Sequence, residues 1–143
     1  MKGSAFVAKE QLISRSHAVT RGVRIEVKAR YSAEHSDLKR PLWFYVYTIS
    51  IENMGSVTVQ LLSRHWEITD GSGHVEHVRG PGVIGKQPVL APGERFEYTS
   101  GCPLSTPFGF MKGEYDMLVT GTEQHFTAEV AGFPLRMADQ ALN

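Results

Sequence analysis

Residues 23–31, VRIEVKARY, alternate apolar and polar side chains along the chain. Val23, Ile25 and Val27 fall on one face of an extended segment, and charged residues separate them. A β-strand with one buried and one solvated face produces this alternation. Residues 42–53, LWFYVYTISIEN, are rich in aromatic and β-branched residues and start apolar on both faces, which is typical of a central strand. Together the two segments predict a β-sheet.

The remaining chain continues this pattern and carries almost no helical periodicity. Further strands are predicted at 57–70, 74–78, 94–102, 108–119 and 124–130, with an edge piece at 133–137. The strand at 57–70 is long enough that we expect a bend near Leu61 and Leu62. Seven or eight short strands separated by turn signals predict an all-β fold, an antiparallel β-sandwich.

Two segments fall outside this strand pattern. Residues 32–41 read as a polar loop, and residues 8–19 are the best helix candidate, with a mobile arm as an equal alternative. We therefore expect an N-terminal arm over 1–20, mobile or paired with the rest, and a single domain over 21–143.

Composition narrows the class of protein. The 143 residues are 41% apolar, and fifteen basic side chains balance fifteen acidic ones. Zero net charge removes the simplest argument for a nucleic-acid partner. Cys102 is the only cysteine, so an intrachain disulfide is excluded and a reducing compartment is expected. With no apolar run that spans a bilayer or starts a secretory signal, the expectation is a cytoplasmic protein without membrane insertion.

A glycine-rich stretch, RGPGVIGKQPVL (79–90), has the G-x-G-x-x-G spacing of dinucleotide-binding loops. That motif requires a helix after its third glycine, and Pro88 and Pro92 forbid a normal helix here. Two interpretations remain: a crossing between sheets, or a weak anion or nucleotide site without a helix. The candidate residues for that site are Arg79, Gly80, Gly82, Gly85 and Lys86.

Metal and catalytic chemistry find little support in the residue pattern. His74 and His77 are three apart on a strand and point to opposite faces, so they cannot chelate one ion without a bulge. No G-x-S-x-G elbow is present, and Cys102 is expected to be a buried, inert thiol. We therefore expect no metal site, no cofactor and no enzymatic activity, with an unrecognised hydrolase as the remote alternative.

Two stretches, LLSRHWEITD (61–70) and TSGCPLSTPFGFMKGEY (99–115), are candidates for a partner-binding surface. The first contains Arg and Trp, which are enriched where proteins bind each other. The candidate residues are Arg64, His65, Trp66, Thr99, Ser100 and Gly101. For Trp66 the alternative is a core aromatic whose indole N–H is satisfied. Exposed edge strands also permit a homodimer, without requiring one.

The chain resembles the ApaG family, also called CorD or DUF525. The resemblance covers about residues 23–135 and rests on SRHW (63–66), ITD (68–70), VRGPGVIGKQPVLAPGE (78–94), FEYTSGCPL (96–104) and TPFG (106–109). It implies an immunoglobulin-like or fibronectin-III-like sandwich and no established catalytic residues. It also implies a genetic association with cobalt tolerance and magnesium efflux, and fused eukaryotic relatives in which the domain looks like a protein-binding module. The resulting hypothesis is a non-enzymatic protein-interaction module with an unidentified protein partner, and the alternative is weak nucleotide or pyrophosphate binding at Gly80–Gly85.

Overall fold

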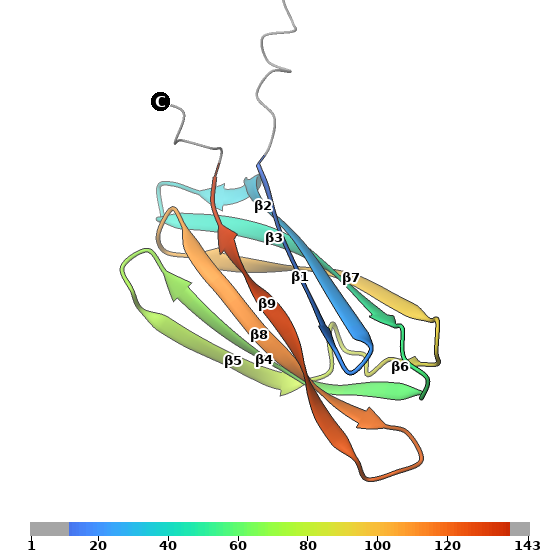
Figure 1. The fold of residues 1–143 in the computed structure, drawn as a ribbon. Coiled ribbons are helices and arrows are strands. Elements are labelled where there is room, and N and C mark those ends of the chain that lie inside the picture. Colours follow the sequence, from blue (N-terminus) through green and yellow to red (C-terminus); the bar gives the residue numbers. More distant parts are fainter. Residues whose placement is uncertain (1–11, 138–143) are drawn as a thin grey trace, which may run out of the picture.

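The structure is a computed structural model that describes residues 12–137. Within that range the chain forms nine strands and no helix. The strands are β1 (Ile13–Thr20), β2 (Val23–Asp37), β3 (Leu42–Asn53), β4 (Val59–Asp70), β5 (Val75–Pro81), β6 (Val89–Leu90), β7 (Arg95–Leu104), β8 (Gly109–Val119) and β9 (His125–Leu135). Figure 1 shows them arranged as two layers.

Each layer is an antiparallel sheet. The first has the order β1-β2-β3-β7, and the second has the order β5-β4-β8-β9, with β6 pairing β4 beyond the end of β5. The predicted all-β sandwich is therefore confirmed, with β1 and β6 added to the strands expected from the sequence. The expected bend in the long strand is a register shift between Leu61 and Ser63 in the pairing of β4 with β8.

The core lies between the two sheets and follows the alternation seen in the sequence. Side chains of Val23, Ile25 and Val27 are buried from β2, and their neighbours Arg24 and Glu26 form an ion pair on the outer face. The largest fully buried side chains include Tyr45, Ile49, Ile51, Leu61, Met111, Tyr115, Met117, Phe133 and Leu135. Burial of these apolar surfaces between the sheets is the main force that holds the sandwich together.

Of the expectations for the N-terminal arm, pairing with the rest of the chain holds for residues 13–20, whereas the helix and the mobile arm are wrong there. Residues 13–20 form a strand rather than a helix or a mobile arm, and they pair with β2 from Ile13 opposite Arg30 to Thr20 opposite Val23. The hairpin closes through Arg21 and Gly22, whose φ angles of 48° and 82° are those of a tight two-residue turn. The sandwich therefore begins before residue 21. Residues 1–11 lie outside the described range.

Two further elements differ from the sequence-based expectation. β2 continues to Asp37, through a register irregularity after Ser32, where a polar loop was expected. The Ser36 hydroxyl donates to the Ser32 carbonyl at 2.7 Å and accepts the Phe44 N–H at 2.8 Å, which holds this irregular end of β2 against β3. The edge piece expected at 133–137 is the end of β9, where Pro134 is tolerated because β9 is an edge strand.

The two sides of the sandwich are closed to different extents. Figure 1 shows β1 (dark blue) lying beside β9 (red). There the Ser16 hydroxyl donates to the Ala131 carbonyl at 2.7 Å, and Glu129 N–H donates to the Thr20 hydroxyl at 3.1 Å. On the opposite side, no backbone hydrogen bond joins β7 to β5 or β6 among residues 12–137. That side is open, and the glycine-rich loop lies at it.

Candidate functional site

The glycine-rich loop connects β5 to β6 over residues 82–88 and contains a tight turn. Val83 N–H donates to the Lys86 carbonyl at 2.8 Å, and Lys86 N–H donates back to the Val83 carbonyl at 2.9 Å. Between them, Ile84 and Gly85 have positive φ angles of 43° and 77°, the signature of a type I′ turn. Gly82 also has a positive φ of 60°, and a Cβ there would overlap the Lys86 carbonyl oxygen. The turn therefore requires glycine at position 82.

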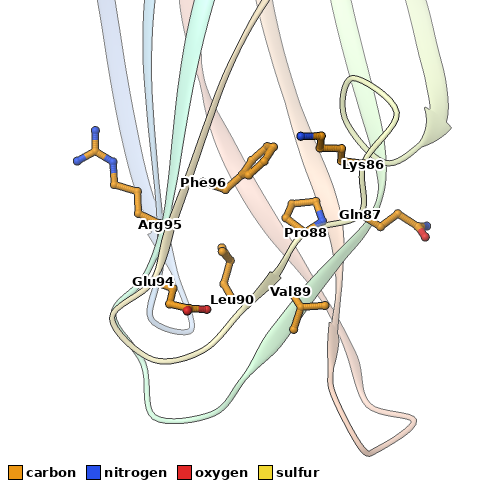
Figure 2. Close-up of a pocket in the computed structure, with 8 residues that line it drawn as sticks. All are labelled: Lys86, Gln87, Pro88, Val89, Leu90, Glu94, Arg95 and Phe96. Atoms are coloured by element: carbon orange, nitrogen blue, oxygen red, sulfur yellow. The ribbon is translucent and has the colours of Figure 1, made fainter.

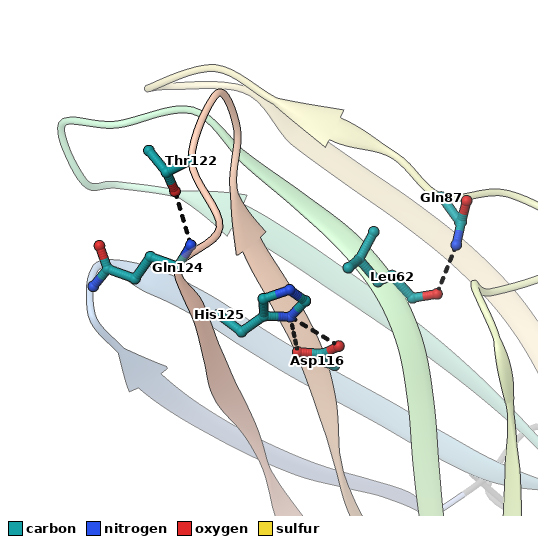
Figure 3. Close-up of polar contacts among 6 residues, drawn as sticks. All are labelled: Leu62, Gln87, Asp116, Thr122, Gln124 and His125. Atoms are coloured by element: carbon teal, nitrogen blue, oxygen red, sulfur yellow. Dashed lines mark hydrogen bonds and ion pairs between the residues drawn. The ribbon is translucent and has the colours of Figure 1, made fainter.

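The loop is tied to β4 at the point where that strand is bulged. Gly82 N–H donates to the Leu62 carbonyl at 2.8 Å, and the Gln87 side-chain amide donates to the same carbonyl at 2.9 Å (Figure 3). Leu61 N–H donates to the Pro88 carbonyl at 3.0 Å. An anion-binding nest needs free, convergent N–H groups. Here the N–H groups of Gly82, Val83 and Lys86 already donate within the protein.

Arg64 supports the same loop from the neighbouring strand. Its Nη1 donates to the Pro81 carbonyl at 3.0 Å and to the Gly82 carbonyl at 2.9 Å. Gly80 leaves room for this guanidinium, because a Cβ at that position would lie 3.0 Å from Nη2. A charged donor shared by two successive carbonyls makes Arg64 a clamp for the loop.

The two cations that flank the glycines line different hollows. Arg79 lies on the outer face of the second sheet, in a hollow of about 250 Å³ that it shares with His65, Glu114 and Asp116. Lys86 lines a separate hollow of about 460 Å³ on the open side of the sandwich. The structure therefore does not bring Arg79 and Lys86 together around one anion.

The predicted partner surface does not form a single patch. Trp66 is buried in the core, where its ring packs edge-on against Tyr47 and Tyr115, so it is not a surface residue. His65, one position earlier on β4, points to the outer face of the second sheet because side chains alternate along a strand. Trp66 thus takes the core role that was its alternative.

The other half of that predicted surface lies on the opposite sheet. Thr99 is exposed on β7, and its hydroxyl is 2.8 Å from that of Thr48 on β3. Ser100 is half-buried on the core side of the same strand. Gly101 lies beneath the Phe44 ring, which a Cβ there would overlap. A partner that contacts Thr99 on the outer face of the first sheet cannot at the same time contact His65, because the sandwich lies between them.

The outer face of the second sheet carries a polar cluster that the sequence spacing did not reveal. His65 Nε2 lies 2.9 Å from His77 Nδ1, and His65 Nδ1 lies 3.5 Å from a Glu114 carboxylate oxygen. On the same face His125 Nδ1 lies 3.0 Å from Asp116 Oδ1 (Figure 3). These contacts join residues far apart in the sequence through strand register. Within residues 12–137 no group of three or more His, Cys, Asp or Glu side chains has a geometry that holds a metal ion.

Cys102 is buried between the sheets, as expected. Burial raises the pKa of its thiol to about 12, and the nearby negative charge of Glu76 acts in the same direction. The thiol is therefore protonated at neutral pH and is a poor nucleophile.

The core side of β7 also carries Tyr98, whose hydroxyl is hydrogen-bonded to that of Tyr115. Burial raises the pKa of both phenols, so both stay neutral.

The hollow beside Lys86 is the most distinctive feature of the open side. Figure 2 shows the Phe96 ring pointing across it toward Pro88 and Lys86, with Leu90 below. Glu94 lies at the opposite end from Lys86, and Arg95 points away. One Glu94 oxygen accepts the Ala91 N–H at 2.8 Å. The hollow thus has an apolar wall with a cation at one end and a carboxylate at the other.

Ile84 lies in the turn that precedes Lys86 and is 53% exposed. A β-branched residue at positive φ is a backbone outlier that costs about 1–2 kcal/mol. Burial of the Ile84 side chain in the core does not offset this cost, since the side chain remains in solvent. Sequence reasoning placed the site on the glycines and their flanking cations, and it overlooked Ile84, Glu94 and Phe96. An apolar residue at the tip of a glycine turn was the available signal.

No helix in the described part of the chain has the length and apolarity needed to cross a membrane.

Known proteins are similar to this chain over most of its length. The ApaG domain family, DUF525, matches residues 33–119. A Protein ApaG from Azorhizobium caulinodans is 52% identical over 124 residues, which is 87% of this chain and 95% of that protein. Another, from a Bradyrhizobium species, is 53% identical over 122 residues, 85% of this chain and 93% of that protein. A crystal structure of a protein designated ApaA from Bordetella pertussis matches with a TM-score of 0.78 and 46% identity, covering 84% of this chain and 98% of that one.

Proposed function

Since the chain belongs to the ApaG domain family, we propose that it is a protein-binding module that acts without catalysis, through the open side of its sandwich. The surface in question consists of the turn at Val83–Lys86 and the hollow beneath it. We name this surface the turn face.

The observation that carries the proposal is the exposed, strained Ile84. A positive φ at a β-branched residue persists only where the surrounding structure imposes it, and such strain gathers at functional sites. An apolar side chain held out in solvent by a hydrogen-bonded turn is pre-organised for burial by another molecule. Pre-organisation of this kind lowers the entropy lost on binding.

The separation of Cys102 from His65 supports binding in preference to chemistry. Cys102 lies between the sheets with a raised pKa, while His65 points outward from the second sheet. The two therefore do not form a nucleophile–base pair. One serine–histidine contact exists among the described residues, between Ser32 Oγ and His35 Nδ1 at 2.7 Å, but Ser32 is only 1% exposed, so a substrate does not reach its hydroxyl.

The resemblance to the family implies a genetic association with cobalt tolerance and magnesium efflux. We propose that this association arises through a partner protein. In this proposal the chain binds a protein that moves or regulates these ions, and it does not bind the ions itself. The lone, buried Cys102 also suits the reducing cytoplasm, which is where we place the interaction.

A photo-crosslinking amino acid at position 84 tests the proposal. The variant is irradiated in lysate of the organism that carries the chain, and crosslinked proteins are identified by mass spectrometry. The matched control carries the same amino acid in place of Val19, which is also 53% exposed but lies on β1 on the closed side. We expect one specific protein at position 84 and not at position 19. If both positions yield the same set of proteins, or none, the proposal is wrong.

A further inference from the structure

The hollow of the turn face has the size of a binding site for one or two side chains. Its volume is about 460 Å³, and ligand pockets in proteins start at about 300 Å³. Its wall is apolar at Pro88, Leu90 and Phe96. Phe96 is only half-buried by the protein itself, so an occupant would complete its burial.

The charges around the hollow are not balanced within the protein. Arg95 is paired with Glu97 at 2.9 Å, so its charge is already neutralised. Among residues 12–137, Lys86 has neither an ion pair nor a side-chain hydrogen bond. A partner that supplies a carboxylate at the Lys86 end would meet an unpaired cation. Glu94 at the other end disfavours a second carboxylate there.

The backbone beside the hollow is also available for pairing. β7 is the last strand of the first sheet, with β3 on one side and no strand on the other within the described residues. An exposed strand edge pairs with extended peptides through main-chain hydrogen bonds, and adjacent pockets select alternate side chains. The hollow lies where β7 begins, at Arg95 and Phe96.

From these three observations we infer that the turn face binds an extended segment of a partner protein that carries an acidic residue two positions from an apolar residue. The segment lies along the free edge of β7. Residues two apart on an extended chain share a face and are about 7 Å apart. The apolar side chain packs on Phe96, and the carboxylate pairs with Lys86. This inference rests on the proposed binding function and specifies the chemistry of its partner.

Selection from a display library of random octapeptides on the full chain tests this inference. Selected peptides are then synthesised and their affinity is measured by fluorescence anisotropy. We expect an acidic residue two positions from an apolar residue, and at least tenfold weaker binding to Lys86→Glu. The control is Lys39→Glu, an equal charge change at an exposed residue in the β2–β3 turn, and it should bind like the wild type. Selection on Lys86→Glu should replace the acidic residue with a basic one.

Three results would overturn the inference. They are the absence of any selected peptide, peptides that bind Lys86→Glu as well as wild type, and a dimer at micromolar concentration that Lys86→Glu dissociates. The last result would assign the turn face to a second copy of this chain. If position 84 crosslinks a specific protein while selected peptides ignore Lys86, the binding module stands and only the acidic-segment chemistry falls. If crosslinking also fails, both proposals fall.

Discussion

Arg64 Nη1 and the Gly82 carbonyl oxygen lie 2.9 Å apart, which joins β4 to the first residue of the glycine-rich loop. The same nitrogen reaches the Pro81 carbonyl at 3.0 Å. Arg64 therefore holds the conformation of the glycine-rich loop, although Gly82 follows it by eighteen positions in the sequence.

Replacing Arg64 should loosen this loop. We expect Arg64→Ala to lower the free energy of unfolding by about 2 kcal/mol, because two carbonyls lose a charged donor in a half-buried position. Urea unfolding followed by tryptophan fluorescence measures the change. Arg95→Ala removes an exposed ion pair and should cost less than about 1 kcal/mol. Equal losses for the two variants would show that Arg64 is no clamp.

Glycine at position 82 should be required more strictly than at position 85. A Cβ at Gly82 would overlap the Lys86 carbonyl oxygen, whereas a Cβ at Gly85 meets nothing within 4 Å. Both residues have positive φ, so either substitution to alanine strains the backbone and lowers the free energy of unfolding by about 1 kcal/mol. We expect Gly82→Ala to be destabilised by about 1–2 kcal/mol more than Gly85→Ala in the same urea experiment. The opposite order would contradict the turn geometry.

Ile84→Asn should stabilise the protein while weakening partner binding. Asparagine tolerates left-handed φ far better than a β-branched residue, so the substitution relieves about 1 kcal/mol of strain. Differential scanning calorimetry should show a higher Tm. Val57→Asn serves as the control, since Val57 is similarly exposed, has no positive φ and does not line the hollow. A lower Tm for Ile84→Asn would mean that Ile84 makes a stabilising contact.

Cys102 should resist thiol reagents in the native state. Its pKa is raised from the ordinary value of 9 to about 12, so the folded protein binds the thiol proton more tightly than the unfolded chain. Stability from this group is complete below pH 9 and falls as the pH rises from 9 to 12. We expect Cys102→Val to lose less stability than the wild type over that interval, as measured by urea unfolding. Rapid reaction of the native thiol at pH 8 would contradict its burial.

The glycine-rich loop should not bind pyrophosphate. Three of its N–H groups donate within the protein, and its flanking cations line separate hollows. Isothermal titration with pyrophosphate, ATP and diadenosine tetraphosphate should give no binding heat at millimolar ligand. Heat that disappears in Lys86→Glu but persists in Lys39→Glu would reinstate the nucleotide-binding alternative at this loop.

Most of the strand framework was predictable because its cause is local. The alternation in residues 23–31 reports which side chains face the core, and Pro88 and Pro92 exclude a helix after the glycines whatever the surroundings. β1 was missed because its periodicity is weak: its pairing depends on the turn at Arg21 and Gly22 and on the neighbouring β2. The short β6 was missed for the same reason, since two residues carry no pattern.

The sequence by itself determined the fold class, the buried thiol and the glycine turn, because alternation, burial preference and φ freedom belong to single residues or short runs. Only the tertiary structure decided which side chains share a surface. It separated Arg79 from Lys86, and it placed His65 and Thr99 on opposite faces of the sandwich. It also brought Lys86 and Phe96 to one hollow. Strand register and the stacking of two sheets fix such neighbours, and both depend on residues far apart in the chain.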